Sequence, residues 1–173
     1  MFGTFYEDSS NYTYTWAKHM PRFASFDQRN YHTLTAREGY ARWAETYEDT
    51  IKHDMDLWLL GQLQSVKWNA VERCADLGCG TGRTAAWLAS KGVLAIDGVD
   101  ATPEMLDRAH ERHVFASLQL ADVCATGLPA ARYDLVTTCL VDEHLAEITP
   151  LYAEAARIAR DGGAYVLFGF PVF

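Results

Sequence analysis

A glycine-rich stretch next to an acidic residue is the part of this sequence best suited to ligand chemistry. It reads Asp-Leu-Gly-Cys-Gly-Thr-Gly over residues 76–82 and follows a short apolar run. Glycines where a strand passes into a helix let the backbone turn tightly and approach a ligand, because no Cβ is in the way. A loop of this kind is compatible with several classes of nucleotide-binding site.

Two of those classes fail at identifiable positions. A dinucleotide-binding loop needs glycine or alanine where this sequence has Arg83, and a P-loop needs Gly-Lys-Ser or Gly-Lys-Thr, which is absent. The sequence therefore disfavours both a dinucleotide site and a P-loop.

Acidic residues also follow the next two apolar runs, at Asp100 and Asp122. Ligands of open α/β sheets bind outside the carboxyl ends of the strands, so Asp76, Asp100 and Asp122 are expected to converge on one crevice. There Asp100 could accept hydrogen bonds from both hydroxyls of a ribose, and Asp122 could meet an adenine amino group. The plainer alternative is that these aspartates only begin polar loops.

The elements that would place these residues follow from the hydrophobic patterns. Alternating strands and helices predict an α/β, Rossmann-like three-layer sandwich with a mostly parallel sheet of five core strands. Thr102 before Pro103 marks a helix start, and Gly92 marks a left-handed helix end. The expected strands are 73–77, 93–99, 115–120, 133–139 and 164–170; the expected helices are 81–91, one from 103, and 150–159 before an Asp-Gly-Gly turn at 161–163.

The residues before the first strand are expected to form helices and an arm. Helical periodicity predicts helices at about 36–47 and 50–68. The second would carry an apolar stripe of Ile51, Met55, Trp58, Leu59, Leu63 and Val66. Residues 1–36 lack this period, and alternating aromatic residues at 12–16 leave a hairpin and a flexible arm as alternatives. We therefore divide the chain into an N-terminal arm or hairpin, 1–36, and a core, 37–173.

Composition and charge restrict the partners. The 173 residues are 49% hydrophobic and carry a net charge of −8, which fits one globular domain and repels a phosphate backbone. Arg108 and Arg112 stand beside acids at helical spacing and are interpreted as a solvated helix face. Neither a secretory signal nor a run of ~20 apolar residues is present. We expect a cytoplasmic protein with no nucleic-acid or membrane partner.

Taken in order, these motifs resemble those of class I S-adenosylmethionine-dependent methyltransferases, and most closely the type 11 small-molecule group. The resemblance spans about residues 40–170. It rests on Asp76-x-Gly78-x-Gly80-x-Gly82, Val-Asp-Ala-Thr-Pro-Glu-Met-Leu at 99–106, Ala-Asp-Val at 121–123, Tyr-Asp-Leu-Val at 133–136 and Asp-Gly-Gly at 161–163. It implies S-adenosylmethionine as the cofactor, S-adenosylhomocysteine as its product, and a small molecule as the methyl acceptor.

The resemblance also implies roles for single residues. Asp76 and the loop 78–82 would hold the methionine end of the cofactor, Asp100 the ribose, and Asp122 with Val123 the adenine. The implied cofactor-binding residues are Tyr40, Asp76, Gly78, Cys79, Gly80, Gly82, Asp100, Ala101, Asp122, Val123 and Cys139. A helix with Tyr40, Trp43 and Tyr47 resembles one that covers the cofactor in relatives, although an aromatic face packed in the core explains it equally well.

A general base is needed only if the acceptor must lose a proton. Relatives place acceptor-facing residues after the fourth strand, where this sequence reads Cys-Leu-Val-Asp-Glu-His over 139–144. His144 is the candidate base, with His19 and His53 as weaker ones; the alternative for His144 is an exposed helix histidine. Adjacent carboxylates more often begin a helix than bind metal, and the four cysteines lack metal-site spacing, so we expect no metal.

The predicted fifth strand ends close to the end of the sequence, whereas relatives continue with two more strands. We therefore expect the C-terminal strand pair to be missing and one apolar edge to need a cover. Three covers are open: a longer parent chain, a homodimer through this edge, or a hairpin folded back from residues 4–16. The same gap leaves a non-catalytic cofactor-binding or partner-binding protein as an alternative function, with a nicotinamide oxidoreductase more distant.

Overall fold

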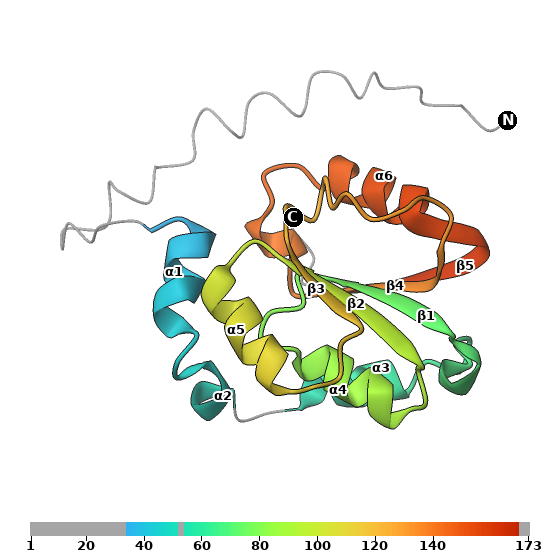
Figure 1. Ribbon diagram of the computed structural model, residues 1–173, viewed down its shortest axis with the longest axis horizontal. Helices are drawn as coiled ribbons and strands as arrows, with labels where there is room; N and C mark the ends of the chain where they lie inside the picture. Colours follow the sequence, from blue (N-terminus) through green and yellow to red (C-terminus); the bar gives the residue numbers. More distant parts are fainter. Residues whose placement is uncertain (1–33, 52–53, 170–173) are drawn as a thin grey trace, which may run out of the picture. The chain divides into compact units, whose positions relative to one another are not determined.

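The computed structural model describes residues 34–51 and 54–169 and contains one parallel five-stranded sheet, in the order β3-β2-β1-β4-β5 (Figure 1). The strands are β1 (Arg73–Leu77), β2 (Ala95–Asp100), β3 (Ser117–Leu120), β4 (Tyr133–Cys139) and β5 (Ala159–Phe168). Leu77 stands beside Val99 and Thr138 in the register, so the carboxyl ends of the three central strands lie together. This arrangement confirms the predicted Rossmann-like fold.

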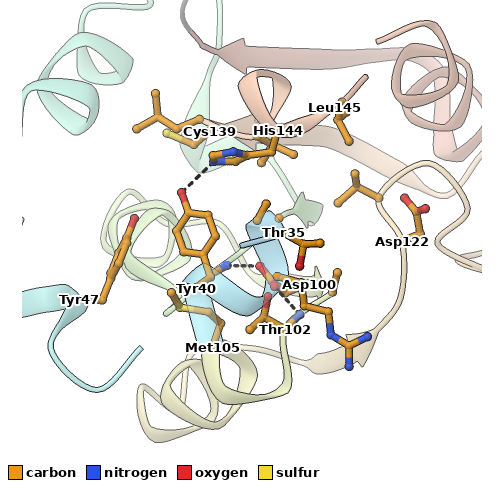
Figure 2. A pocket seen from close by; sticks show the side chains of 18 residues that line it. Thr35, Tyr40, Tyr47, Asp100, Thr102, Met105, Asp122, Cys139, His144 and Leu145 are labelled. Carbon is orange, nitrogen blue, oxygen red and sulfur yellow. Dashed lines mark hydrogen bonds between the residues drawn. The ribbon is translucent and has the colours of Figure 1, made fainter. Parts of the chain in front are cut away.

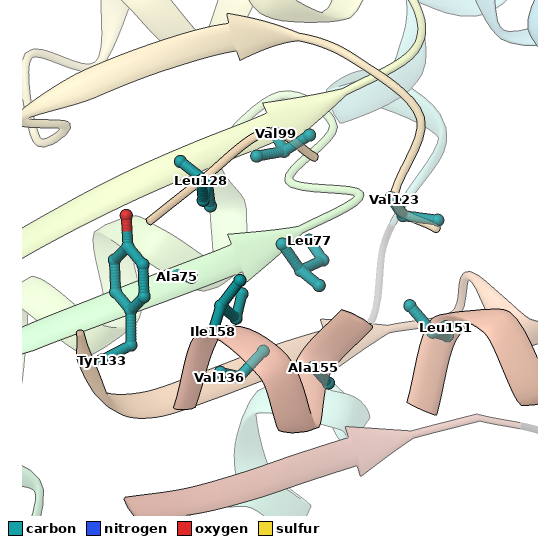
Figure 3. Packing of buried hydrophobic residues seen from close by; sticks show 10 residues of the cluster. All are labelled: Ala75, Leu77, Val99, Val123, Leu128, Tyr133, Val136, Leu151, Ala155 and Ile158. Atoms are coloured by element: carbon teal, nitrogen blue, oxygen red, sulfur yellow. The ribbon is translucent and has the colours of Figure 1, made fainter. Parts of the chain in front are cut away.

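Helices cover both faces of the sheet (Figure 1). On one face lies α6 (Thr149–Ile158); on the other lie α3 (Met55–Gly61), α4 (Arg83–Ser90) and α5 (Pro103–Glu111). The core beneath α6 joins side chains from β1, β2 and β4 to one stripe of the helix, as Figure 3 shows. The stripe consists of Leu151, Ala155 and Ile158, whose spacing of four and three residues places them on a single face.

A buried carboxylate ties α6 to the loop between β3 and β4. Glu154 is 7% exposed and accepts hydrogen bonds from Arg157 Nε at 2.7 Å, Arg157 Nη2 at 2.7 Å and the Thr126 backbone N–H at 2.8 Å. The Arg157 hydrogen bonds lower the pKa of Glu154 to about 2 against the effect of burial, and those from Thr126 lower it further. The ionised form of Glu154 therefore stabilises the fold.

We expect Glu154→Gln to lower the free energy of unfolding by about 2–3 kcal/mol at pH 7, because one oxygen of a multiply bonded, buried anion becomes a donor facing Arg157. The folded pKa lies below the ordinary value of 4.5, so the stabilisation is complete above that value and is lost as the pH falls toward 2. Urea unfolding of wild type and variant at pH 7 and pH 2.5 measures this difference. The exposed Glu147→Gln serves as the control, and a difference of equal size at both pH values would contradict the prediction.

The first predicted helix is interrupted. The structure has α1 (Ala36–Trp43), a turn over 44–46 and α2 (Tyr47–Thr50) where the periodicity predicts one helix over 36–47. Thr35 caps α1, because its hydroxyl accepts the Glu38 N–H while the Glu38 carboxylate accepts the Thr35 N–H. Across the turn, Trp43 Nε1 donates to Thr50 Oγ1 at 2.9 Å and links the last residue of α1 to the last residue of α2.

The second predicted helix, over 50–68, is wrong in both length and buried face. Helix α3 has seven residues, and a short 3-10 turn, η2 (Trp68–Ala70), follows after a gap. Met55 and Trp58 of the predicted core stripe are 61% and 63% exposed, whereas Asp56 and Leu60 are buried. The cause is Arg83 on α4, which pairs with Asp56 and turns that side of the helix inward.

Strand β5 begins earlier than predicted. Ala159 pairs with Tyr133, an irregular stretch then contains the predicted Asp-Gly-Gly turn, and regular pairing resumes where Ala164 lies beside Leu135. Within the described residues β3 and β5 are the sheet edges, and pairing of the β5 edge with a second copy stays a prediction. The hairpin predicted for 4–16 lies outside these residues. None of the described helices has the length and apolarity needed to cross a membrane.

Candidate functional site

A cavity of about 370 Å³ opens at the carboxyl ends of the central strands, between these ends and α1 (Figure 2). Its size is within the range of about 300–1,000 Å³ that small-molecule and cofactor sites occupy. Eight of the residues predicted to bind a cofactor line it: Tyr40, Gly78, Gly80, Asp100, Ala101, Asp122, Val123 and Cys139. The candidate base His144 also lines it, so the structure gathers most of the predicted site in one place.

Three predicted residues do not line the cavity. Gly82 precedes α4 with φ +81°, and Cys79 is buried. Burial raises the pKa of the Cys79 thiol well above its ordinary value, which agrees with an inert cysteine. Asp76 is 1% exposed and belongs to the interior of the sheet. Direct cofactor contacts by these three residues stay predictions.

Two glycines of the loop have left-handed backbone angles, but a side chain at each position would meet different surroundings. Gly78 has φ +71°, and a Cβ there would lie 2.3 Å from Val141 Cγ2. Gly80 has φ +52°, and a Cβ there would have no atom within 4 Å. Gly78 is therefore required by packing against Val141 in the segment after β4, whereas Gly80 leaves open space in which a ligand can approach the backbone.

Asp100 organises the floor of the cavity. Its Oδ2 accepts the Gly80 N–H at 2.9 Å, and its Oδ1 accepts the Thr102 N–H at 2.8 Å. One carboxylate thus connects the glycine loop with the start of α5 (Figure 2). Each carboxylate oxygen has a further lone pair, so Asp100 keeps the capacity to accept ligand hydroxyls.

Of the two other aspartates of the predicted site, Asp122 is exposed and Asp76 is buried. Asp122 is exposed, lies two residues beyond the end of β3, and accepts the Cys124 N–H at 2.8 Å. Asp76 Oδ1 accepts the Thr137 hydroxyl at 2.7 Å, while its buried Oδ2 has no hydrogen-bond partner among the described residues. Burial raises the pKa of Asp76 to about 6, the Thr137 hydrogen bond lowers it in part, and Asp100 raises it further.

Aromatic side chains of α1 and α2 close one side of the cavity. The Tyr40 hydroxyl lies 2.9 Å from His144 Nε2, and the two side chains point toward each other in Figure 2. Burial, with smaller effects of Glu143 and Asp100, raises the pKa of Tyr40, so the phenol keeps its proton at neutral pH. Tyr47 also lines the cavity, whereas Trp43 packs on Tyr40 and Tyr47 from outside it.

His144 belongs to a 3-10 turn, η3 (Asp142–His144), and not to a regular helix. Its side chain is 33% exposed, which is compatible both with a general base and with an exposed histidine that has no catalytic role. The turn follows Leu140, whose φ of +57° is unusual for a residue with a Cβ. This backbone turn places Val141 and His144 at the cavity.

Sequence reasoning did not assign several lining residues to the site, among them Thr35, Met105 and Leu145. The pattern Thr35-x-x-Glu38 is a capping box and would have located the start of α1. Leu145 carries no such signal, since its placement depends on the turn at Leu140. The weaker base candidates His19 and His53 lie outside the described residues. The described part of the chain contains no group of three or more His, Cys, Asp or Glu side chains placed to hold a metal ion.

A parallel Rossmann-like sheet whose glycine loop and acidic strand ends meet at one cavity defines a nucleoside-cofactor-binding domain. Residues 75–167 match the family described as methyltransferase domain. The chain therefore belongs to this family, within the class I S-adenosylmethionine-dependent methyltransferases, and the cofactor of that class is S-adenosylmethionine.

Individual relatives agree with this assignment. The chain is 30% identical over 131 residues to malonyl-(acyl-carrier protein) O-methyltransferase of Serratia marcescens, covering 75% of this chain and 49% of the relative. It is 27% identical over 107 residues to 27-O-demethylrifamycin SV methyltransferase of Amycolatopsis mediterranei, covering 58% and 39%. The YcgJ protein of Bacillus subtilis superposes with a TM-score of 0.58 at 27% identity, covering 66% of this chain and 50% of YcgJ. The chain thus spans about half the length or less of the curated relatives it matches.

Proposed function

We propose that this protein transfers the methyl group of S-adenosylmethionine to a hydroxyl oxygen of a small, largely apolar acceptor. The observation that carries the proposal is the single cavity in which the glycine loop, Asp100 and Asp122 meet the Tyr40–His144 pair. The first group suits a nucleoside cofactor, and the second offers a base beside it.

The residues present fit the cofactor in chemical type. Asp100 supplies a carboxylate suited to ribose hydroxyls, and Asp122 supplies an acceptor suited to an amino group. Gly80 exposes backbone to the cavity without a side chain, and the unpartnered Oδ2 of Asp76 is an acceptor for a cationic donor. Tyr40 and Tyr47 present aromatic rings, which favour a nearby sulfonium by about 0.5–2 kcal/mol.

The acceptor side of the cavity supports an uncharged substrate. Leu140, Val141 and Leu145 are apolar, and the ionisable groups in or beside the cavity include the carboxylates of Asp100, Asp122 and Glu143 and the guanidinium of Arg37. Apolar walls with more carboxylates than cations nearby favour an uncharged acceptor over an anionic one. One relative above is named as an O-methyltransferase of malonyl-(acyl-carrier protein) and the other as a methyltransferase of 27-O-demethylrifamycin SV, so oxygen acceptors occur among the relatives.

The chain's own residues then have limited tasks. When bound, S-adenosylmethionine supplies a methyl group on a sulfonium, which a positioned oxygen can attack in one displacement. In the proposed mechanism the Tyr40 phenol donates to Nε2 of the His144 tautomer that carries its proton on Nδ1, and Glu143 Oε1 lies 3.4 Å from the same nitrogen. An acceptor hydroxyl that replaces the phenol as donor gives its proton to Nε2 as its oxygen gains the methyl group. Proximity and exclusion of water supply the rest of the rate enhancement.

Calorimetric titration with S-adenosylmethionine and S-adenosylhomocysteine tests the cofactor half of the proposal, with NAD as the negative control. We expect binding near 1:1 for the first two ligands and none for NAD. Release of S-adenosylhomocysteine with a panel of phenols, alcohols and carboxylic acids tests the acceptor half. Cofactor binding without turnover of any oxygen acceptor would favour the non-catalytic alternative.

For His144→Gln we expect kcat for a hydroxyl acceptor to fall by about 10²–10⁴-fold, which is the usual contribution of a general base. Affinity for S-adenosylhomocysteine should stay within about twofold, because the base contributes to proton transfer rather than to cofactor binding. Tyr40→Phe, which keeps the ring and removes the hydroxyl, is the matched comparison and should lower kcat less. An unchanged kcat in His144→Gln, measured with saturating cofactor, would remove His144 from the mechanism.

A further inference from the structure

The helices that cover the cavity have little apolar contact to hold them in place. Helix α1 has eight residues, α2 has four, and neither buries a side chain completely; Ala44 in the turn between them is the buried residue. Isolated helices of this length are marginal in water. The segment 35–50 carries Tyr40 and Tyr47, so its position over the cavity depends on polar links to the rest of the domain.

One such link joins α2 directly to the glycine loop. A carboxylate oxygen of Glu48 accepts hydrogen bonds from the Thr81 hydroxyl and from Arg112 Nη2, the latter at 2.6 Å. Arg112 Nε donates to the Thr81 carbonyl oxygen at 2.6 Å and closes the triangle. We call Glu48, Thr81 and Arg112 the Glu48 clasp.

The clasp joins three groups that differ in exposure. Thr81 is 2% exposed, the Arg112 side chain 29% and the Glu48 side chain 47%. The Arg112 guanidinium uses two donors in a fixed fork, one on a carboxylate and one on a carbonyl, which a flexible pair does not provide. Burial raises the pKa of Glu48, but the hydrogen bonds from Thr81 and Arg112 bring it below its ordinary value, so Glu48 is ionised at neutral pH.

The clasp lies outside the cavity. Its three residues are absent from the cavity lining and surround a separate surface hollow between α2 and α5. The Tyr40–His144 hydrogen bond spans the cavity, and a bound acceptor replaces it in the proposed mechanism. The clasp therefore can hold the 35–50 segment whether or not a ligand is present.

Resting on the proposed function, we infer that Glu48 and Arg112 are positioning residues that hold the 35–50 segment over the cavity and thereby set cofactor affinity. The sequence predicts a solvated helix face for Arg112; the structure corrects this, because its partner is Glu48, 64 positions away in the chain. If only a fraction of molecules has the segment in place, the apparent dissociation constant rises by the reciprocal of that fraction.

The test uses the full chain with Glu48→Gln, Arg112→Gln and the double variant, with S-adenosylhomocysteine as the ligand. Loss of hydrogen bonds to a charged group corresponds to about a tenfold rise in the dissociation constant for each single variant. The double variant should resemble the singles, because each change breaks the same link. Arg112→Lys, which keeps the charge but not the fork, should fall between wild type and Arg112→Gln.

The matched control is Arg108→Gln on the same helix, which removes an exposed 3.4 Å pair with Glu111 and leaves the clasp intact. Hydrogen exchange of the unliganded proteins provides a readout independent of binding. Amides of residues 35–50 should exchange faster in the clasp variants than in wild type, and at the wild-type rate in the control. Amides of β1 and β4 should stay protected in all of these proteins.

Unchanged exchange of 35–50, faster exchange of the whole sheet, or effects of the two single variants that add in the double would each overturn the inference. If wild type fails to bind S-adenosylhomocysteine, the proposed function fails on its own. The exchange measurement then still decides whether the clasp holds the segment.

Discussion

Asp100→Ala is expected to weaken S-adenosylhomocysteine binding about a hundredfold. The carboxylate accepts the Gly80 and Thr102 amides, so its loss releases the glycine loop from α5 in addition to removing the acceptor proposed for the ribose. Hydrogen bonds to charged groups contribute about 1.5–3 kcal/mol each, and 1.4 kcal/mol is tenfold in affinity. Calorimetric titration beside wild type measures the change.

Two comparisons separate the site from simple loss of charge. Asp107→Ala removes an exposed carboxylate from α5 and should leave affinity unchanged within about twofold. Asp100→Asn should remain weak, because its amide nitrogen cannot accept the backbone N–H that one carboxylate oxygen now accepts. Wild-type affinity in Asp100→Ala would mean that the ligand lies elsewhere.

Alanine substitutions of the two loop glycines should affect different properties, Gly78→Ala mainly stability and Gly80→Ala mainly ligand affinity. Gly78→Ala is expected to destabilise the protein by about 2–4 kcal/mol, because the left-handed backbone costs about 1–2 kcal/mol and the new Cβ overlaps Val141. Gly80→Ala should destabilise the protein only by the cost of the left-handed backbone. Its Cβ enters the cavity, however, and should weaken S-adenosylhomocysteine binding at least about tenfold. Urea unfolding and calorimetry of both variants measure the two effects.

A rescue variant checks the cause of the larger stability loss. Gly78→Ala combined with Val141→Ala removes the overlapping methyl group and should recover stability relative to the sum of the two single changes. If the double variant is no more stable than that sum, contact with Val141 is not the source of the effect.

The sheet and most of the cavity could be predicted because their signals are local. β1 and β4 have the predicted bounds, and β1 ends directly before the glycine loop that begins at Gly78. Thr102 and Pro103 begin α5 as predicted, and Gly92 has φ +96°. Glycine and acidic residues at strand ends converge because parallel strands share one edge.

The errors concern residues whose placement depends on distant partners. Periodicity assigned Met55 and Trp58 to the core because it counts apolar residues, and it has no information about Arg83, which draws Asp56 inward instead. β3 starts two residues later than predicted because Phe115 packs over Gly82 and Gly98, where a Cβ would lie 2.7 Å from its ring.

The placement of the short segment after β4 likewise depends on structure that its own sequence does not reveal. Nothing in its sequence marks Leu140 as left-handed, and the turn at Leu140 decides which side chains reach the cavity. The acceptor-facing region could therefore be located from sequence, but its geometry could not.

The left-handed backbone at Leu140 also has a meaning for the evolution of this domain. A leucine in this conformation costs about 1–2 kcal/mol, and glycine there would avoid the cost. Glycine would also let the turn relax and would loosen the presentation of Val141 and His144. Selection for thermal robustness therefore favours glycine at this position, whereas selection for a firmly positioned Val141 and His144 favours leucine, so the residue after β4 is one where stability and site geometry oppose each other.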